Sequence, residues 1–143
     1  MKFICLGYID PSVPVTTSET EWHAMMDSCF TYDDQLRANG HFKGGEALQP
    51  PNTAMTLRYT NGRVVVTDGP FAETKELIAG FWIFQVASLA ECIEWVKRCP
   101  NPMPSDSEIE IRQIFEVEDF GDAFSPELRE QEERIRAQLS SDN

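Results

Sequence analysis

The sequence has few of the residues that build metal or redox sites. It contains two His and four Cys, and these form neither a CxxC pair nor a spacing typical of zinc ligands. Most of the cysteines lie among apolar neighbours, as small buried side chains do. We therefore expect buried thiols, and we expect the protein to use no metal and no cofactor. The four are Cys5, Cys29, Cys92 and Cys99.

Long apolar runs and basic residues are also scarce. No run approaches the roughly 18 apolar residues of a membrane span, and the opening KFICLGYID is too short for the apolar region of a secretory signal. We expect a cytoplasmic protein. The chain has 12 Lys and Arg against 24 Asp and Glu, a net charge of −12. Such a chain repels phosphate backbones, which excludes nucleic acids and anionic membranes as expected partners.

The 143 residues fit one domain that can bury a core without a disulfide or metal staple. The charge is uneven along this length. Residues 116–143 hold nine acidic residues and three Arg, which gives −6, half of the net charge. The tail therefore differs in composition from the body.

A long first helix is predicted with both of its ends. Ser18 and Glu21 form a capping box, and Asn39-Gly40 favours the left-handed conformation that ends helices. Apolar residues between them recur at steps of three and four, which predicts one buried stripe. The stripe is Trp22, Met25, Met26, Cys29, Phe30 and Leu36.

The other elements are marked by turns and alternation. Asn61-Gly62 tolerates positive φ at both residues and predicts a hairpin. Ser88 and Glu91 predict a second capping box, and Ser125-Pro126 opens a terminal helix. Residues 41–52 lack periodicity, so a strand fragment and a loop both remain open. The expected strands are 2–8, 54–60, 63–67, 79–86 and 108–115.

This order, β-α-β-β-β-α-β with a tail helix, predicts an α+β fold of the ferredoxin-like, split βαβ type with an added hairpin. Two helices cover only one face of such a sheet. Strands 2–8 and 79–86 are apolar on both faces, so the other face would be a large exposed apolar patch. A second copy of the chain is the simplest cover and predicts a homodimer. Coverage by the tail helix is the alternative.

The segment VVVTDGPFAETKELIAGFW (64–82) resembles the YCII-related proteins of the DGPF type, a bacterial family. The opening MKFICLGY, the stretch GHFKGGEALQPP and the segment SLAECIEWVKRCP match as well, so the resemblance covers roughly residues 1–116. It implies a dimeric α+β barrel over 1–116 and an acidic helical extension over 117–143. It also implies association with a sigma factor, and no defined activity.

The resemblance to YCII proteins implies an acid/base pair. One member is a His on the first helix, and the other is an Asp before the penultimate strand. The Asp matches Asp68, while the His position falls near Cys29 in this chain. His23 is too early in the helix to replace it. His41, just past the helix, is the remaining His, although the helix dipole alone also favours a cation there.

The loop after the hairpin is the main candidate site. Asp68 precedes Gly69-Pro70, where it acts either as a base beside an apolar cleft or as an acceptor for the amides of its own turn. Glu73 and Lys75 are either ligand contacts or a solvated pair. The catalytic candidates are Asp68 and His41, and the ligand-binding candidates are Phe71, Glu73, Lys75, Glu46 and Arg58.

Two functions follow from these residues. The first is a small-molecule-binding or regulatory accessory protein, favoured because the first-helix His is missing. The alternative is a cofactor-independent lyase or isomerase that acts on a small acid, aromatic acids included, through Asp68.

Overall fold

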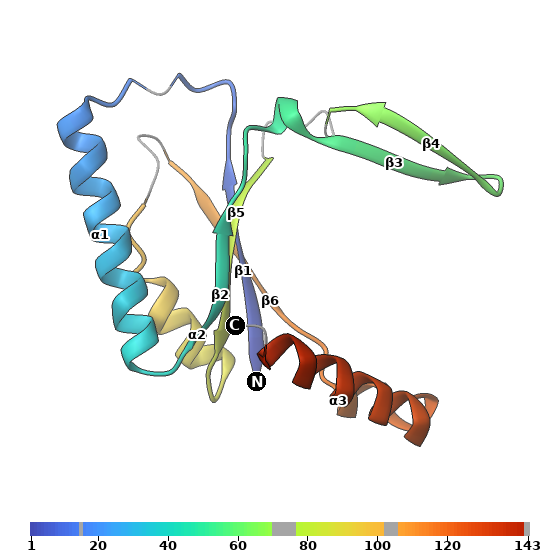
Figure 1. Cartoon of the computed structure of the whole chain (residues 1–143). Coiled ribbons are helices and arrows are strands. Elements are labelled where there is room, and N and C mark those ends of the chain that lie inside the picture. Colours follow the sequence, from blue (N-terminus) through green and yellow to red (C-terminus); the bar gives the residue numbers. More distant parts are fainter. Residues whose placement is uncertain (15, 70–76, 102–105, 142–143) are drawn as a thin grey trace. The chain divides into compact units, whose positions relative to one another are not determined.

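The computed structural model describes residues 1–14, 16–69, 77–101 and 106–141 (Figure 1). The chain divides into two compact units, Met1–Gln113 and Ile114–Asn143. The first unit contains β1 (Lys2–Ile9), α1 (Glu19–Ala38), β2 (Phe42–Ala47), β3 (Met55–Thr60), β4 (Arg63–Asp68), β5 (Leu77–Gln85), α2 (Leu89–Val96) and β6 (Glu108–Gln113), with a short 3-10 turn at Pro51–Thr53. None of the described helices is both long and apolar enough to cross a membrane.

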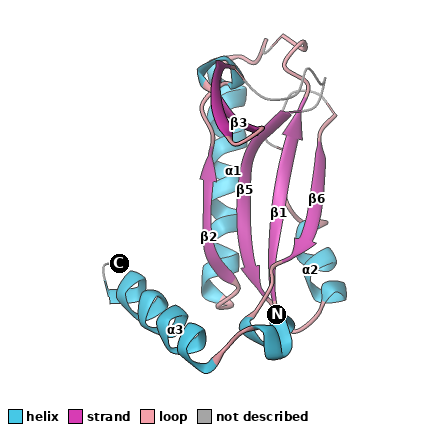
Figure 2. Ribbon diagram, turned by 90° about the vertical axis from the view of Figure 1, so that its right-hand side faces the viewer, coloured by secondary structure: helices cyan, strands magenta, loops and turns pink. Residues whose placement is uncertain are grey.

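Four strands form an antiparallel sheet in the order β2-β5-β1-β6, and β3 and β4 form a separate two-stranded sheet. The first and third of the main strands lie at the centre, which is the split βαβ arrangement. Helices α1 and α2 lie on one face of this sheet (Figure 2). The predicted α+β, ferredoxin-like fold is therefore confirmed, and residues 41–52 contain an edge strand, β2.

Both ends of α1 are set by local chemistry. The Ser18 hydroxyl accepts from the Glu21 amide while the Glu21 carboxylate accepts from the Ser18 amide, so the predicted capping box forms. At the other end Gly40 has φ of +72°, a conformation that glycine adopts without strain. The hairpin turn forms as predicted at Asn61 and Gly62, both with positive φ. The second helix differs in detail, because Glu91 accepts from the Ala87 amide instead of closing a box on Ser88.

The core lies between the helices and one face of the sheet. Its buried members share this layer and come from β1, α1, β5, the residue after β5 and α2, and they are Phe3, Cys5, Tyr32, Leu36, Phe84, Val86 and Cys92. The expected stripe of α1 is wrong at two positions, because Trp22 and Phe30 are 48% and 60% exposed. Tyr32 takes a core place that the stripe did not include, and its hydroxyl donates to the Trp95 carbonyl at 2.9 Å.

The second unit contains a 3-10 segment, Val117–Ala123, and α3, Pro126–Ser141. The terminal helix predicted after Ser125 is thus present. The Arg129 guanidinium donates to the carbonyls of Gly121 and Phe124, which ties the helix to the preceding turn. The apolar residues of α3 are exposed, and they are Leu128, Ile135 and Leu139.

Candidate functional site

Asp68, the main sequence candidate, ends β4 and has an exposed side chain opposite Met55. The backbone just after it is held in place: the Gly69 amide donates to the Ala54 carbonyl at 2.7 Å, and the Thr56 hydroxyl donates to the Gly69 carbonyl at 2.8 Å. Three further candidates, Phe71, Glu73 and Lys75, lie outside the described residues.

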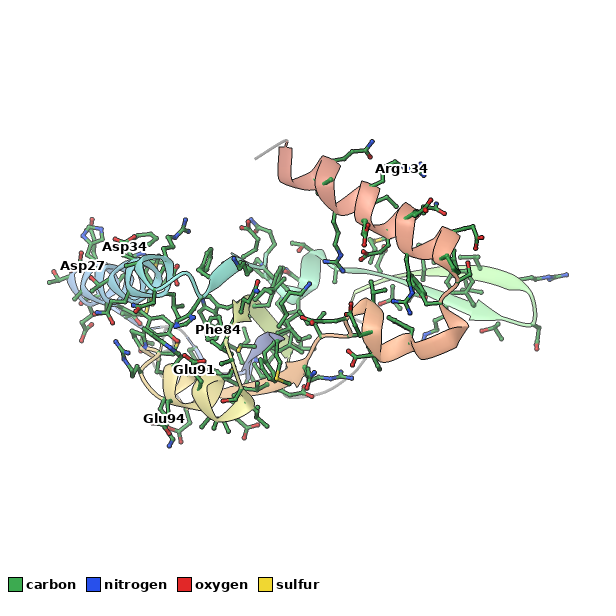
Figure 3. The ribbon with its side chains drawn as sticks, turned by 90° about the horizontal axis from the view of Figure 1, so that it is seen from below. Asp27, Asp34, Phe84, Glu91, Glu94 and Arg134 are labelled. Atoms are coloured by element: carbon green, nitrogen blue, oxygen red, sulfur yellow. The ribbon has the colours of Figure 1, made fainter. Side chains whose placement is uncertain are left out.

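His41 has contacts that join three elements. Its Nδ1 atom donates to the Gln85 carbonyl at 3.1 Å. Its ring and the Trp95 ring form an edge-to-face pair whose centroids are 5.1 Å apart. Its Nε2 atom lies 3.7 Å from a Glu91 carboxylate oxygen. In Figure 3, Glu91 lies on the side of α2 toward Phe84, and Glu94 lies on the opposite side. These contacts place His41 where the end of α1, the end of β5 and the start of α2 meet.

The structure does not bring Asp68 and His41 together within one chain. His41 precedes the first residue of β2, whereas the hairpin that carries Asp68 begins beyond the other end of that strand. The length of β2 therefore separates them. Glu46 is exposed on β2 opposite Phe81, and Arg58 is exposed on β3 opposite Val65.

A carboxyl that the sequence analysis missed lies on the buried side of α1. Asp33 is half-buried, and this burial raises its pKa, while hydrogen bonding to Trp82 and the charge of Arg37 oppose the shift. Asp33 follows Cys29 by one helical turn and precedes the buried Leu36 by another. A charged residue at this spacing within an apolar stripe is the signal that would have found it.

The cysteines gather in the same layer between helices and sheet. All four are free thiols, and burial raises the pKa of each of them. For Cys99 burial, with smaller contributions from Cys29 and Asp33, brings the pKa to about 12. A thiol of this kind stays protonated at neutral pH and is a poor nucleophile. Among the described residues, no group of three or more His, Cys, Asp or Glu is arranged to hold a metal ion.

The opposite face of the sheet is covered by neither α1 nor α2. Its centre is apolar: Ile4 pairs with Ile83 and Leu6 pairs with Phe81 across β1 and β5. These four side chains are half-buried. Because side chains alternate along a strand, this face is the complement of the one that carries Phe3, Cys5 and Phe84 into the core.

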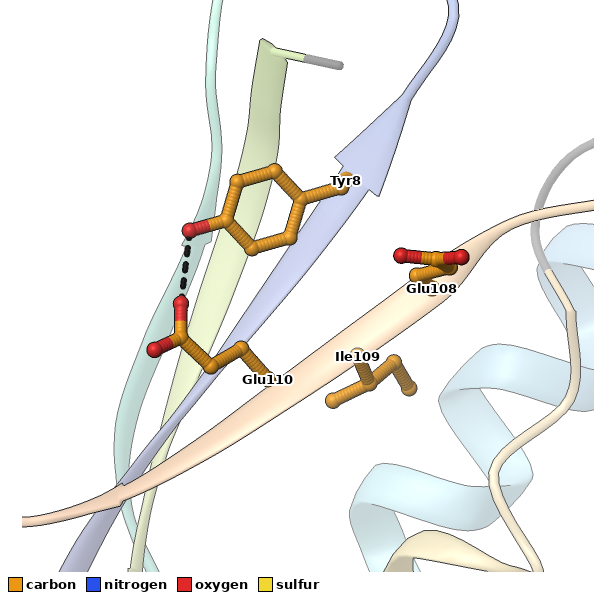
Figure 4. A pocket seen from close by; sticks show the side chains of 4 residues that line it. All are labelled: Tyr8, Glu108, Ile109 and Glu110. Carbon is orange, nitrogen blue, oxygen red and sulfur yellow. Dashed lines mark hydrogen bonds between the residues drawn. The ribbon is translucent and has the colours of Figure 1, made fainter.

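A hollow of about 360 Å³ lies at the β6 edge of the sheet (Figure 4). It is lined by Tyr8, Glu108, Ile109 and Glu110. The Tyr8 hydroxyl donates to a Glu110 carboxylate oxygen at 2.8 Å. The Arg112 Nε atom lies 3.8 Å from the other Glu110 oxygen, an exposed ion pair of the weak kind. The hollow thus combines two carboxylates and one phenol, whereas the Ile109 side chain between the two Glu residues points to the other face of the sheet and packs on the core.

This hollow was not among the sequence candidates. The alternation of Glu108 and Glu110 with Ile109 was visible in the sequence, but Tyr8 lies about a hundred positions away in the chain. Only the strand order, which pairs β1 with β6, brings them together. A central strand with Tyr near its end, beside an edge strand with Glu on one face, is the pattern that would have indicated it.

A comparison with models of protein families shows which family the chain belongs to. The model of the YCII-related domain matches residues 1–118. The chain belongs to the YCII-related family. A relative in Rhizobium meliloti (strain 1021), an uncharacterized protein, is 33% identical over 114 residues, which are 80% of this chain and 92% of the relative. Membership thus agrees with the DGPF-type resemblance of the sequence, while the relative assigns no activity.

Within this YCII-related chain, the first-helix position near Cys29 carries a thiol where the resemblance implies an imidazole. Burial, together with the charge of Asp33, raises the pKa of that thiol. A thiol with a raised pKa does not accept a proton from a substrate as an imidazole does. The acid/base chemistry implied by the resemblance therefore lacks its second group at this position.

Proposed function

We propose that this YCII-related protein is a homodimeric small-molecule-binding accessory protein, and that its ligand occupies the hollow beside Tyr8 and Glu110. The observation that carries the proposal is the arrangement of that hollow. A phenol and two carboxylates border a hollow of about 360 Å³, the lower end of the size range of small-molecule sites. Polar groups of this kind orient a ligand, while Leu6, opposite Glu110 on the same face of the sheet, offers an apolar contact.

The charges of the hollow indicate the class of ligand. Glu108 and Glu110 are acceptors when ionised, and the surrounding protein carries a net charge of −12. A cationic amine would make charge-assisted hydrogen bonds to these carboxylates. A carboxylate ligand of equal size would be repelled. The ligand we expect is therefore a small amine, with an apolar portion that contacts Leu6, which lies opposite Glu110 on the same face of the sheet.

The homodimer is supported by the open face of the sheet. Ile4, Leu6, Phe81 and Ile83 form a continuous apolar centre that the two helices of the first unit do not cover. Apolar patches of this kind mark interfaces, and a two-fold contact in which each copy covers this face of the other would remove both faces from water. We also propose the features that the sequence led us to expect. These are a dimeric α+β barrel, a cytoplasmic location, association with a sigma factor, and an acidic helical extension at residues 117–143 that is separate from the domain.

A matched pair of probes tests the ligand class. Benzylamine and benzoate share a ring and differ in charge. In calorimetric titrations we expect benzylamine to bind the wild type and benzoate not to bind. Glu110→Gln should weaken benzylamine binding by roughly tenfold, the loss of about one charge-assisted hydrogen bond. Glu94→Gln is the control, because Glu94 is exposed on the far side of α2 and pairs only locally with Lys97. Benzoate binding that is unchanged in Glu110→Gln would contradict the proposal.

A second candidate function, cofactor-independent acid/base catalysis, is favoured by Asp33. A carboxyl with a raised pKa is suited to donate or accept a proton nearer neutral pH. In this alternative Asp33 joins Asp68 as a candidate group. Benzoate binding that is lost in Asp68→Ala or Asp33→Asn, with benzylamine inactive, would favour the enzyme over the amine-binding protein.

A further inference from the structure

The β3–β4 hairpin has one apolar face that is open to solvent. Opposed residues of an antiparallel pair share a face, and the register places Leu57 opposite Val66 and Tyr59 opposite Val64. Tyr59 is 81% exposed and Val66 is 57% exposed. The other face carries Thr56, Arg58 and Thr67 around a single apolar residue, Val65. The hairpin is therefore amphipathic, and its apolar face has the composition of a buried surface.

This exposure conflicts with the stability of the hairpin. In the part of the chain that the structure describes, β3 and β4 form a sheet of only two strands. Two-stranded hairpins are marginal in water unless they pack on another surface. The hairpin leaves the end of the four-stranded sheet on the side away from α1 and α2 (Figures 1 and 2). That is the side on which Ile4, Leu6, Phe81 and Ile83 lie open.

The charge of the hairpin indicates what covers it. Residues 55–68 contain Arg58 and Arg63 against Asp68, a net charge of +1, whereas the whole chain carries −12. The remaining residues therefore carry −13. Both Arg lie on the face with Val65, and Asp68 lies at the end of the apolar face. The charge therefore acts at long range: an acidic second copy would attract this basic segment without ion pairs in the apolar contact, whereas two acidic bodies alone repel each other.

We propose that the β3–β4 hairpin is an arm whose apolar face packs on the open sheet face of a second copy of this chain. This inference rests on the homodimer of the proposed function and adds its contact surface. Two-fold symmetry gives two arms per dimer, each on the other copy. The face with Leu57, Tyr59, Val64 and Val66 is buried in the dimer, and the face with Val65 remains in solvent.

Val66 and Val65 provide a matched test. They are neighbours on β4 with similar exposure, 57% and 50%, and they lie on opposite faces of the hairpin. Val66→Asp and Val65→Asp make the same chemical change and the same loss of strand propensity. We expect Val66→Asp to raise the dimer dissociation constant at least ~100-fold, since one buried valine is lost in each of two arms. Val65→Asp should leave it within about threefold of the wild type.

The dissociation constants are measured by sedimentation equilibrium, and circular dichroism confirms that each variant is folded. A photo-reactive benzophenone side chain at position 59 adds a readout that does not depend on stability. Cross-links to β1 or β5 peptides of a differently isotope-labelled copy support the arm. Cross-links only within one chain overturn it.

The outcomes separate this inference from the homodimer on which it rests. A wild type that is monomeric at high concentration removes the homodimer, and the arm inference falls with it. A wild-type dimer that both variants leave intact overturns the arm alone. A dimer that both variants weaken equally also overturns it, because the apolar face then has no special role.

Discussion

Truncating Leu36 should separate the true core stripe of α1 from the stripe that the apolar pattern suggests. Leu36 is fully buried, with 0% exposure, in the cluster with Phe3, Phe84 and Cys92. Leu→Ala at such sites lowers the free energy of unfolding by about 2–5 kcal/mol, through lost transfer energy and the cavity left behind. For a domain of this size, 1 kcal/mol corresponds to roughly 4 °C in melting temperature. We therefore expect Leu36→Ala to melt roughly 8–20 °C below the wild type.

Phe30→Ala is the matched control on the same helix. Phe30 is the larger side chain but is 60% exposed, so we expect a change within about 0.5 kcal/mol, or roughly 2 °C. Both variants are measured by thermal and urea denaturation, with the denaturant slope m compared to verify that the same surface is exposed. A loss in Phe30→Ala that equals or exceeds the loss in Leu36→Ala would refute this placement of α1 on the sheet.

Three further predictions concern polar groups. Burial raises the pKa of Asp33, so its folded-state pKa lies above the unfolded value of 3.8 and the ionised form destabilises the fold. Asp33→Asn should therefore be more stable than the wild type at pH 7, and this gain in the free energy of unfolding should fade below about pH 4. Urea titrations at several pH values measure it, and an equal gain at pH 3 would contradict the prediction. His41→Ala should lower the free energy of unfolding by about 1–2 kcal/mol, because the Gln85 carbonyl loses its donor. His23→Ala, at an exposed position of α1, is the control and should change it by less than about 0.5 kcal/mol. Equal melting temperatures of the two variants would contradict a structural role for the His41 contacts. Tyr8→Phe should weaken benzylamine binding severalfold. It should change the melting temperature little, because the hydrogen bond from Tyr8 to Glu110 lies at an exposed edge of the sheet. An unchanged affinity in calorimetry would exclude the phenol from the site.

The sequence predicted those elements whose ends carry their own chemistry. Ser18 with Glu21, and Asn61 with Gly62, satisfy or bend the backbone locally, so α1 and the hairpin appear as expected. Strand β2 left no such signal, because it contains Gly44 and Gly45. A side chain at position 45 would lie 2.8 Å from the Phe81 carbonyl oxygen. The same close approach that requires glycine there removes the apolar alternation that identifies strands.

The buried face of α1 and the candidate site depended on tertiary contacts. Trp22 and Phe30 fit a helical stripe, yet the sheet contacts the turn of Tyr32 and Leu36. Tyr8 meets Glu110 only because β1 pairs with β6, a long-range choice that no local pattern encodes. The sequence candidates depended on single residues and a loop, and they therefore could not indicate a hollow whose walls come from opposite ends of the chain.

The central claim, a small-molecule site at the hollow of the sheet edge, is tested most directly by mapping where an amine binds. Amide resonances of the isotope-labelled protein are followed by two-dimensional NMR during titration with benzylamine. We predict that shifts saturate and concentrate at Tyr8 and Glu108–Glu110, the residues that line the hollow. Shifts that concentrate instead at Asp68 and Gly69, or an absence of saturable shifts, would contradict the proposed site.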